Sequence, residues 1–314
     1  MHSHLAALTL GSAFAQWRWN TMAAVLIVVL GGGYLVAVRR AVAAGAQHRN
    51  VRTVCFVGIG CGFWFLASMS WVGVYSDALF WVRALQVLLL YFVVPLGFAL
   101  GTPVTVLRQS LRPLGQARLD AILHARSARI LTHPAITSIA MIGMPFALYL
   151  TGWLPAALDN SALDALTMVI LVLVGFGYFY SRLQDDPVPH HYPQSISLIV
   201  SIAETIADGV LGLVLWLGPP IAAAHYARLG LTWAPERYTD QTIGAGIEWI
   251  LGDALGIPFL LLLLNAFGRD EGRKSARVDA QLQAKASAAA QDDQPATTEL
   301  WWESDPQFRA RYRR

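Results

Sequence analysis

The chain has 314 residues, of which 55% are hydrophobic and 14% are charged, and its mean hydropathy is +0.47. These values lie outside the range of soluble globular domains and predict a polytopic membrane protein. The formal net charge is +3 and the sequence holds no nucleic-acid-binding motif, so a nucleic-acid-binding protein is not expected.

Seven stretches are long and apolar enough to cross a bilayer, which requires about 20 residues at a rise of about 1.5 Å each. The predicted spans are Thr21–Val38, Thr53–Val74, Leu79–Leu107, Ile130–Gly152, Leu163–Tyr180, Ile196–Leu217 and Thr242–Phe267. The expected fold class is therefore all-α, an integral membrane bundle of about seven transmembrane helices. Pro219-Pro220 is expected to end the sixth span, because proline removes a backbone donor and clashes with the preceding turn.

The basic residues predict the orientation of the bundle. Nineteen of the 23 lysines and arginines lie on one side of the bundle, namely between spans one and two, three and four, five and six, and after span seven. The positive-inside rule then places the N-terminus outside and the C-terminus in the cytoplasm. We expect an extracytoplasmic segment over residues 1–20 without a removable signal peptide, a transmembrane domain over 21–267, and a cytoplasmic tail over 268–314 that is partly helical or disordered.

Charged side chains also lie inside the predicted spans, where an ionisable group needs a partner, a water-filled cavity or a function. They are Arg83, Asp164, Glu204, Asp208, Glu248 and Asp253. Their depths predict that spans three, five, six and seven converge on one buried polar cluster in the outer half of the membrane. Glu204 and Asp208 are four residues apart, so they share a helix face that we expect to point inward.

This expected cluster has three interpretations. In a metal site, Asp164, Asp208 and Glu248 supply carboxylates and Met168 supplies a thioether, although copper(I) prefers sulfur and imidazole ligands. In a structural network, Arg83 neutralises one or two carboxylates while the others stay protonated. In an ion or proton path, the same acids form a relay.

The start of the last span carries the most specific pattern in the chain. Asp240-Gln241 is followed by Gly244 and then by Trp249, Gly252 and Asp253. Other pieces are Gly101-Thr102-Pro103, Thr132-His133-Pro134, Pro145 to Thr151, Asp186-Pro187-Val188-Pro189 and Trp301-Trp302-Glu303-Ser304-Asp305-Pro306. In this order the pieces resemble the CtaG-type family of bacterial cytochrome c oxidase assembly proteins, from about the second span onward.

The resemblance implies a multi-pass protein of the bacterial plasma membrane that assists the assembly of a caa-type oxidase, with oxidase subunits as partners and copper as the associated metal. It also implies intramembrane histidines around Gln86, before Gly175 and before Gly212. This chain has other residues there, namely Arg83, Val87, Asp164, Met168, Ile170 and Asp208. The imidazoles that the resemblance implies as copper ligands are therefore missing.

Three functions follow from these observations. The first is an assembly factor for a haem–copper oxidase that holds a partner subunit or handles copper on the outer side. The second is a small ion- or proton-coupled transporter that uses Asp164, Asp208, Glu248 and Asp253, and the third is a structural paralogue without metal binding. No nucleophile–base arrangement, phosphate loop or zincin helix is present, so we expect no enzymatic activity. The oligomeric state stays open, and Trp301-Trp302 predicts an interfacial anchor, a docking element or a disordered tail.

Overall fold

A computed structural model describes residues 5–183, 186 and 194–254, with scattered positions between 256 and 287. The side chains of residues 194–202 are not among those described. The chain divides into two compact units, residues 1–264 and 265–314. The predicted Trp301-Trp302 element and most of the second half of the seventh predicted span lie outside the described residues.

Every regular element in the described part of the chain is a helix. The helices are α1 (Leu10–Ala15), α2 (Thr21–Ala43), α3 (Asn50–Thr53), η1 (Val54–Cys61), α4 (Gly62–Met69), α5 (Trp71–Tyr75), α6 (Phe80–Leu88), η2 (Leu89–Val93), α7 (Val94–Leu100), α8 (Pro103–Ser110), α9 (Pro113–Leu123), α10 (Arg126–Leu131), α11 (Pro134–Leu150), α12 (Trp153–Asp159), α13 (Ser161–Leu183), α14 (Gln194–Leu217), α15 (Ala223–Leu229), α16 (Arg237–Gly246) and η3 (Ile247–Leu251). The segments labelled η are π-helical. The predicted all-α class is confirmed.

Four helical stretches are long and apolar enough to cross a membrane: Thr21–Ala43, Asn50–Met69, Phe80–Ser110 and Ser161–Leu183. A fifth is formed if α11 and α12, which meet at an angle of 67°, count as one broken span. Helix α14 has 24 residues, so it is also long enough at about 1.5 Å per residue. The count of seven spans and the orientation stay predictions.

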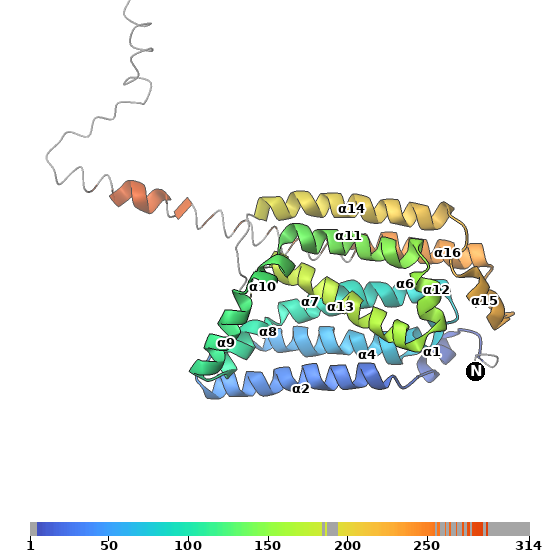
Figure 1. Cartoon of the computed structure of the whole chain (residues 1–314), viewed down its shortest axis with the longest axis horizontal. Coiled ribbons are helices and arrows are strands. Elements are labelled where there is room, and N and C mark those ends of the chain that lie inside the picture. The colour runs from blue at the N-terminus through green and yellow to red at the C-terminus, as the bar shows by residue number, and fades with distance from the viewer. Residues whose placement is uncertain are drawn as a thin grey trace, which may run out of the picture. The chain divides into compact units, whose positions relative to one another are not determined.

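The long helices lie side by side, while short helices lie across their two ends (Figure 1). Helix α2 packs against α8 and α4, and α7 packs against both η1 and α13. On the other side, α13 packs against α11, which contacts α14, and α14 contacts α16. Helices α9 and α10 lie at one end of the bundle, and α1, α12 and α15 lie at the other (Figure 1).

Two glycines allow the central helices to approach closely. A Cβ atom on Gly97 of α7 would lie 2.5 Å from the backbone nitrogen of Gly60 in η1, and one on Gly175 of α13 would lie 2.2 Å from the carbonyl oxygen of Tyr91 in η2. Small residues serve this purpose in membrane helices, where backbone contact replaces the hydrophobic driving force. The part of the third span formed by η2 and α7 is thereby held between η1 and α13.

Several helix boundaries in the structure differ from those that the hydropathy pattern predicted. The third span bends at Thr102, whose φ of 48° is left-handed, and α8 begins directly after it at Pro103. The fourth span begins at Pro134 instead of Ile130, because α10 ends in the preceding turn. Helix α13 extends beyond Tyr180 to Leu183, so Arg182 lies within a helix and not in a loop.

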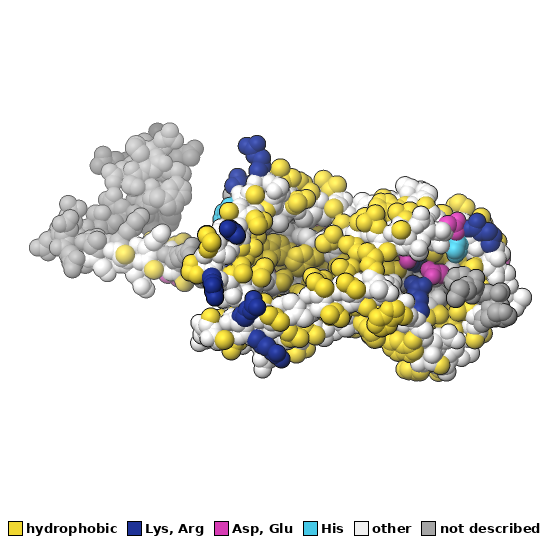
Figure 2. All heavy atoms as spheres, turned by 60° about the horizontal axis from the view of Figure 1, so that its bottom comes forward, with side chains coloured by type: hydrophobic (Ala, Val, Ile, Leu, Met, Phe, Trp, Pro, Cys, Tyr) yellow, Lys and Arg dark blue, Asp and Glu magenta, His cyan; other side chains and the backbone are white. Residues whose placement is uncertain are grey.

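The two ends of the first unit differ in charge. Lys and Arg side chains gather at the end where α9 and α10 lie, and a largely hydrophobic surface separates this end from the other (Figure 2). At the opposite end, Arg18 pairs with Asp77 at 2.6 Å, and His225 and Arg228 both contact Asp159. This distribution is the one on which the predicted orientation rests.

Candidate functional site

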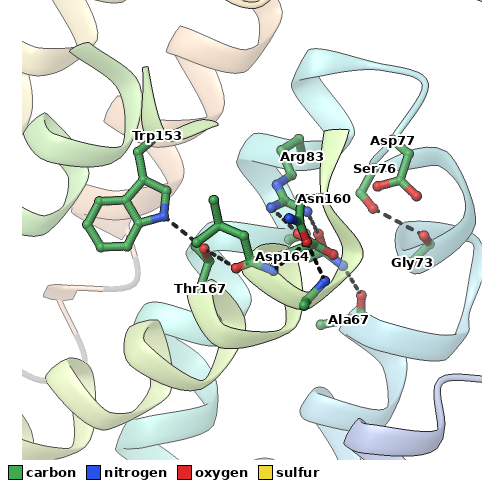
Figure 3. A network of polar contacts seen from close by, with 12 residues as sticks. Ala67, Gly73, Ser76, Asp77, Arg83, Trp153, Asn160, Asp164 and Thr167 are labelled. Carbon is green, nitrogen blue, oxygen red and sulfur yellow. Dashed lines mark hydrogen bonds and ion pairs between the residues drawn. The ribbon is translucent and has the colours of Figure 1, made fainter. Parts of the chain in front are cut away.

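Arg83 is the centre of a buried polar network near the end where α12 and α15 lie. It projects from α6 with 1% of its side chain exposed, and one terminal nitrogen forms an ion pair with Asp164 in the first turn of α13 (Figure 3). The other terminal nitrogen donates to the side-chain oxygen of Gln86 at 3.0 Å. Gln86 in turn donates to the carbonyl oxygen of Ala67 at 2.8 Å, which ties α6 to α4.

Other polar groups of this region bind no partner among the described residues. They are the Nε of Arg83, the Oγ of Ser68 and the hydroxyl of Tyr226. Tyr226 lies in α15 with 1% exposure and within electrostatic range of Arg83. A buried donor without a partner is uncommon, so the hydrogen bonding of these three groups is less complete than that of the network around them.

Glu248 occupies a π-helical turn in the middle of the last described helix. Its carboxylate, in η3, accepts a hydrogen bond from the hydroxyl of Tyr149 in α11. Single π-turns inside helices often occur at functional sites, because they rotate the following residues relative to a regular helix. Asp208 of α14 lies within electrostatic range of Glu248, and Asp253 shares a hydrogen bond with Trp249.

Glu204 belongs to a second buried network at the other end of α13. Its carboxylate accepts hydrogen bonds from the hydroxyl of Tyr178 and from Arg182, whose nitrogen lies 3.2 Å away. The same arginine nitrogen donates to the hydroxyl of Ser138 at 2.5 Å, and the guanidinium lies 5.1 Å from the centroid of the Tyr178 ring. This network joins α11, α13 and α14.

The two networks are separated by almost the length of a membrane span. Asp164 lies in the first turn of α13 and Arg182 in its last turn. The 18 steps between them correspond to about 27 Å of helix, close to the thickness of about 30 Å of a hydrocarbon core. The carboxylate and the arginine each lie at the helix end where the macrodipole favours their charge.

Asp240 and Gln241, the first residues of the resemblance pattern, hold backbone ends in place. The Asp240 carboxylate accepts from the backbone nitrogens of Phe80 and Trp81, both at 3.0 Å, and thereby caps α6. The Gln241 side chain accepts from the nitrogen of Ile221 at 2.6 Å and donates to the carbonyl oxygen of Leu215 at 2.7 Å. These contacts bind α16 to α6 and to the turn that follows α14.

Asp186, which also belongs to the resemblance pattern, has the same role at the opposite end. Its carboxylate accepts from the backbone nitrogens of Val104 at 3.0 Å and Thr105 at 2.8 Å, in the first turn of α8. Burial raises the pKa of Asp186 above the ordinary range of an aspartate, while the bonds to α8 act in the opposite direction. Neither α6 nor α8 has a side-chain cap from its own N-cap residue, so each depends on a carboxylate from another segment.

The structure therefore distributes the predicted site residues over several places. Asp164 pairs with Arg83, Glu248 with Tyr149 and Glu204 with Arg182, while Met168 is buried in the apolar core. In the part of the chain that is described, no group of three His, Cys, Asp or Glu side chains is placed to hold a metal ion. The metal site of Asp164, Met168, Asp208 and Glu248 stays a prediction that this geometry does not favour.

Sequence reasoning missed the partners of these acids. Arg182 was expected in a loop and is fully buried, and the hydroxyls of Tyr149 and Tyr178 were not expected to bind carboxylates. One signal for Arg182 was available: it is the single arginine between spans five and six, and it follows an aromatic run by two residues.

Comparison with known families decides what the chain is related to. The sequence profile of the family described as cytochrome c oxidase caa3 assembly factor (Caa3_CtaG) matches residues 32–269. The chain belongs to this family. The match includes both arginine networks and both carboxylate caps, so these features lie within the region that the family shares.

Similar proteins occur in mycobacteria. The chain is 25% identical over 274 residues to an uncharacterized protein of Mycobacterium leprae (strain TN), a match that covers 85% of this chain and 41% of that protein. It is 24% identical over 280 residues to uncharacterized proteins of Mycobacterium bovis and Mycobacterium tuberculosis, covering 86% of this chain and 42% of each. The chain thus spans about two-fifths of the length of these relatives. No solved structure matches it.

Proposed function

We propose that this chain is an assembly factor for a haem–copper cytochrome c oxidase in the bacterial plasma membrane, and that it acts by holding an oxidase subunit against its helices. The observation that carries the proposal is the family match over residues 32–269. The family's description supplies the role in oxidase assembly and implies a non-catalytic one. Holding a subunit is the mechanism that we infer for this chain.

The way in which the intramembrane acids are used supports holding over copper handling. Asp164 is neutralised by Arg83, and Glu248 accepts from Tyr149, so each carboxylate already accepts a hydrogen bond within the protein. Carboxylates are also hard ligands, whereas copper(I) prefers sulfur and imidazole. Met168 offers a suitable sulfur but is buried among apolar side chains.

Assembly activity is tested in a strain that lacks this gene. Oxidase activity of its membranes should fall, and a tagged copy of the full chain should restore the activity and co-purify with an oxidase subunit. The Arg228→Gln variant is the matched control for expression, because its side chain is exposed and pairs with the exposed Asp159 at the surface. Unchanged oxidase activity in the deletion strain contradicts the assembly role.

Metal analysis separates holding from copper handling. The purified full chain and its Asp164→Ala and Asp208→Ala variants are loaded with copper(I) under reducing conditions and then freed of excess metal. A scaffold should retain far less than one copper per chain in all three samples. One copper per wild-type chain that is lost in both variants overturns the scaffold in favour of copper handling.

An ion or proton path is the second candidate, and a series of neighbouring acids inside the bundle supports it. Asp208 lies within electrostatic range of Glu248 on one side and of Glu204 on the other. Liposomes that contain the purified chain and a pH-sensitive dye test for this path. Proton flux that is present in the wild type and absent in Asp208→Asn would establish transport, whereas equal flux in both samples and in empty liposomes excludes it.

A further inference from the structure

The helices α8, α9 and α10 form a continuous basic segment at one end of the bundle. Helices α9 and α10 run across the ends of the long helices instead of alongside them (Figure 1). The corner between α8 and α9 is fixed, because Arg108 binds both carboxylate oxygens of Asp120 at 2.9 and 3.0 Å. Gln116 also donates to the carbonyl oxygens of Arg108 and Leu111, each at 3.1 Å. The segment is therefore held at a defined angle to the spans.

This segment has a large excess of positive charge. Residues 108–131 contain five arginines, and Asp120 is their single acid. Arg108 lowers the pKa of the Asp120 carboxyl below its ordinary range through their hydrogen bonds, so this acid is ionised and already occupied. Arg112, Arg118, Arg126 and Arg129 are exposed and form no ion pair within the described part of the chain.

Large apolar side chains are exposed on the same two helices. They are Leu114 and Ile122 in α9, and Ile130 and Leu131 in α10. Leu114, Arg118 and Ile122 are each four residues apart, so they follow one face of α9, and Arg126 and Ile130 have the same relation in α10. Exposed apolar residues interleaved with arginines are typical of helices that lie in a membrane interface.

The connection between α2 and α3 adds to this charge. Together with the last turns of α2 and with α3 itself, it carries Arg39, Arg40, Arg49 and Arg52 and no acid, and α2 packs directly against α8. Figure 2 shows the basic side chains of this end at the border of the hydrophobic surface that covers the spans. The arginines therefore lie at the depth at which lipid headgroups meet a transmembrane bundle.

We propose that the exposed face of α9 and α10 binds the phosphate groups of anionic phospholipids, with the arginines on the phosphates and Leu114, Ile122, Ile130 and Leu131 among the upper acyl carbons. Charge complementarity selects an anionic ligand, and the shared apolar face selects a lipid over a soluble anion or an acidic protein loop. The inference is independent of the role in oxidase assembly.

The test uses the purified full chain in a neutral detergent and compares three additives: phosphatidylglycerol, phosphatidylcholine and inorganic phosphate. Binding is read by native mass spectrometry and by the shift in thermal melting temperature. We expect phosphatidylglycerol to remain bound and to raise the melting temperature, and the other two additives to have little effect. Each arginine near an anionic surface contributes a similar share of the binding free energy. The triple variant Arg118→Gln/Arg126→Gln/Arg129→Gln should therefore weaken phosphatidylglycerol binding about 100-fold.

The matched control is Arg228→Gln, which removes an exposed arginine at the opposite end of the bundle. It should bind phosphatidylglycerol like the wild type. A second variant, Leu114→Ser/Ile122→Ser, keeps the charge and should weaken phosphatidylglycerol binding without affecting expression.

Each other outcome contradicts the proposal. Equal binding of phosphatidylglycerol and phosphatidylcholine means that the face does not select charge. An equal shift with inorganic phosphate means a soluble-anion site, and an acidic peptide that displaces the lipid at equal concentration means a protein-docking surface. If the triple variant does not fold, single Arg118→Gln and Arg129→Gln variants carry the same comparison with a loss of about fivefold each.

Discussion

Two buried arginines, one near each end of α13, each neutralise an acid, but the two acids differ in their surroundings. Arg83 pairs with Asp164, whose side chain is 16% exposed, and it also donates to Gln86. Arg182 pairs with Glu204, whose side chain is 9% exposed, and it also binds Ser138 and packs on Tyr178. Each network joins three helices, α4, α6 and α13 in the first and α11, α13 and α14 in the second, so the two differ mainly in how far the acid is exposed.

The difference in exposure determines which of the two acids water can reach. Asp164 keeps some access to solvent at the N-terminal end of α13, where the helix macrodipole also stabilises its charge. Glu204 has little such access and depends on Arg182 and Tyr178. A buried ion pair is a modest source of stability as a whole, but the loss of one partner is severe when the other cannot reach water.

The largest effect is expected at Arg182. Arg182→Met replaces the arginine with an apolar side chain of similar length and leaves the Glu204 carboxylate without its cation. We expect a loss of about 3–5 kcal/mol in the free energy of unfolding. Unfolding of the purified protein in detergent measures this loss. The double variant Arg182→Met/Glu204→Leu should recover most of the stability, because an apolar pair of similar volume replaces the ion pair.

The control for that experiment is Arg126→Met, which changes an exposed arginine to the same residue and should alter the free energy of unfolding by less than about 0.5 kcal/mol. A loss at Arg182 no larger than at Arg126 would show that the network around Glu204 does not stabilise the bundle.

The Arg83 pair should respond asymmetrically. Asp164→Ala leaves a guanidinium that is 1% exposed without a counter-charge, and we expect a loss of about 3 kcal/mol. Arg83→Met leaves only the partly exposed Asp164, which can be hydrated, and we expect about 1–2 kcal/mol. Unfolding of the two variants under identical detergent conditions measures the difference. Equal losses contradict the inference that water reaches Asp164.

The tyrosines extend the comparison from arginines to neutral donors. Tyr149 donates to Glu248, and no cation pairs with that carboxylate among the described residues, so Tyr149→Phe should cost about 1–3 kcal/mol. Tyr178→Phe leaves Glu204 with Arg182, so it should cost about 1 kcal/mol. Both variants remove a single oxygen atom, and each serves as the control for the other in unfolding measurements. A larger effect at Tyr178 reverses the expected order.

The sequence predicted the membrane helices and the inward direction of several polar residues for a simple reason. Apolar periodicity and length report whether a helix crosses a bilayer, and a charge within such a helix must avoid lipid. Arg83 and Glu204 are both buried, as that rule requires. The family resemblance, which rested on the order of short patterns, was confirmed by the match over residues 32–269.

The partners of these residues could not be predicted in the same way. A tyrosine in a span looks apolar by composition, so Tyr149 and Tyr178 gave no sign that they bind carboxylates. The expected convergence of all the acids assumed regular helices, whereas η3 interrupts the regular turn at Glu248. Arg182 was misplaced because the hydrophobic run ends at Tyr180 and the helix does not.

The smallest effect is expected at the two carboxylate caps, which lie at opposite ends of the third span. Asp240→Ala removes the cap of α6 and Asp186→Ala removes the cap of α8, and each should cost about 0.5–2 kcal/mol, as is typical of helix caps. Asp186 adds a dependence on pH. Because burial raises its pKa in the folded protein, its contribution to stability is present in full below the ordinary pKa of an aspartate.

That contribution is lost as the pH rises through the raised pKa, since the unfolded chain then gives up the proton more readily than the folded protein. Asp186→Asn keeps an oxygen acceptor for α8 but cannot ionise. The melting temperature of the wild type should therefore fall relative to that of Asp186→Asn as the pH increases from about 4 to about 7. Subtracting one variant from the other cancels the titration of all other groups, including Asp120, whose pKa is shifted in the opposite direction. A difference that is constant with pH would mean that the bonds to α8 cancel the effect of burial at Asp186, and one that grows in favour of the wild type would mean that they outweigh it.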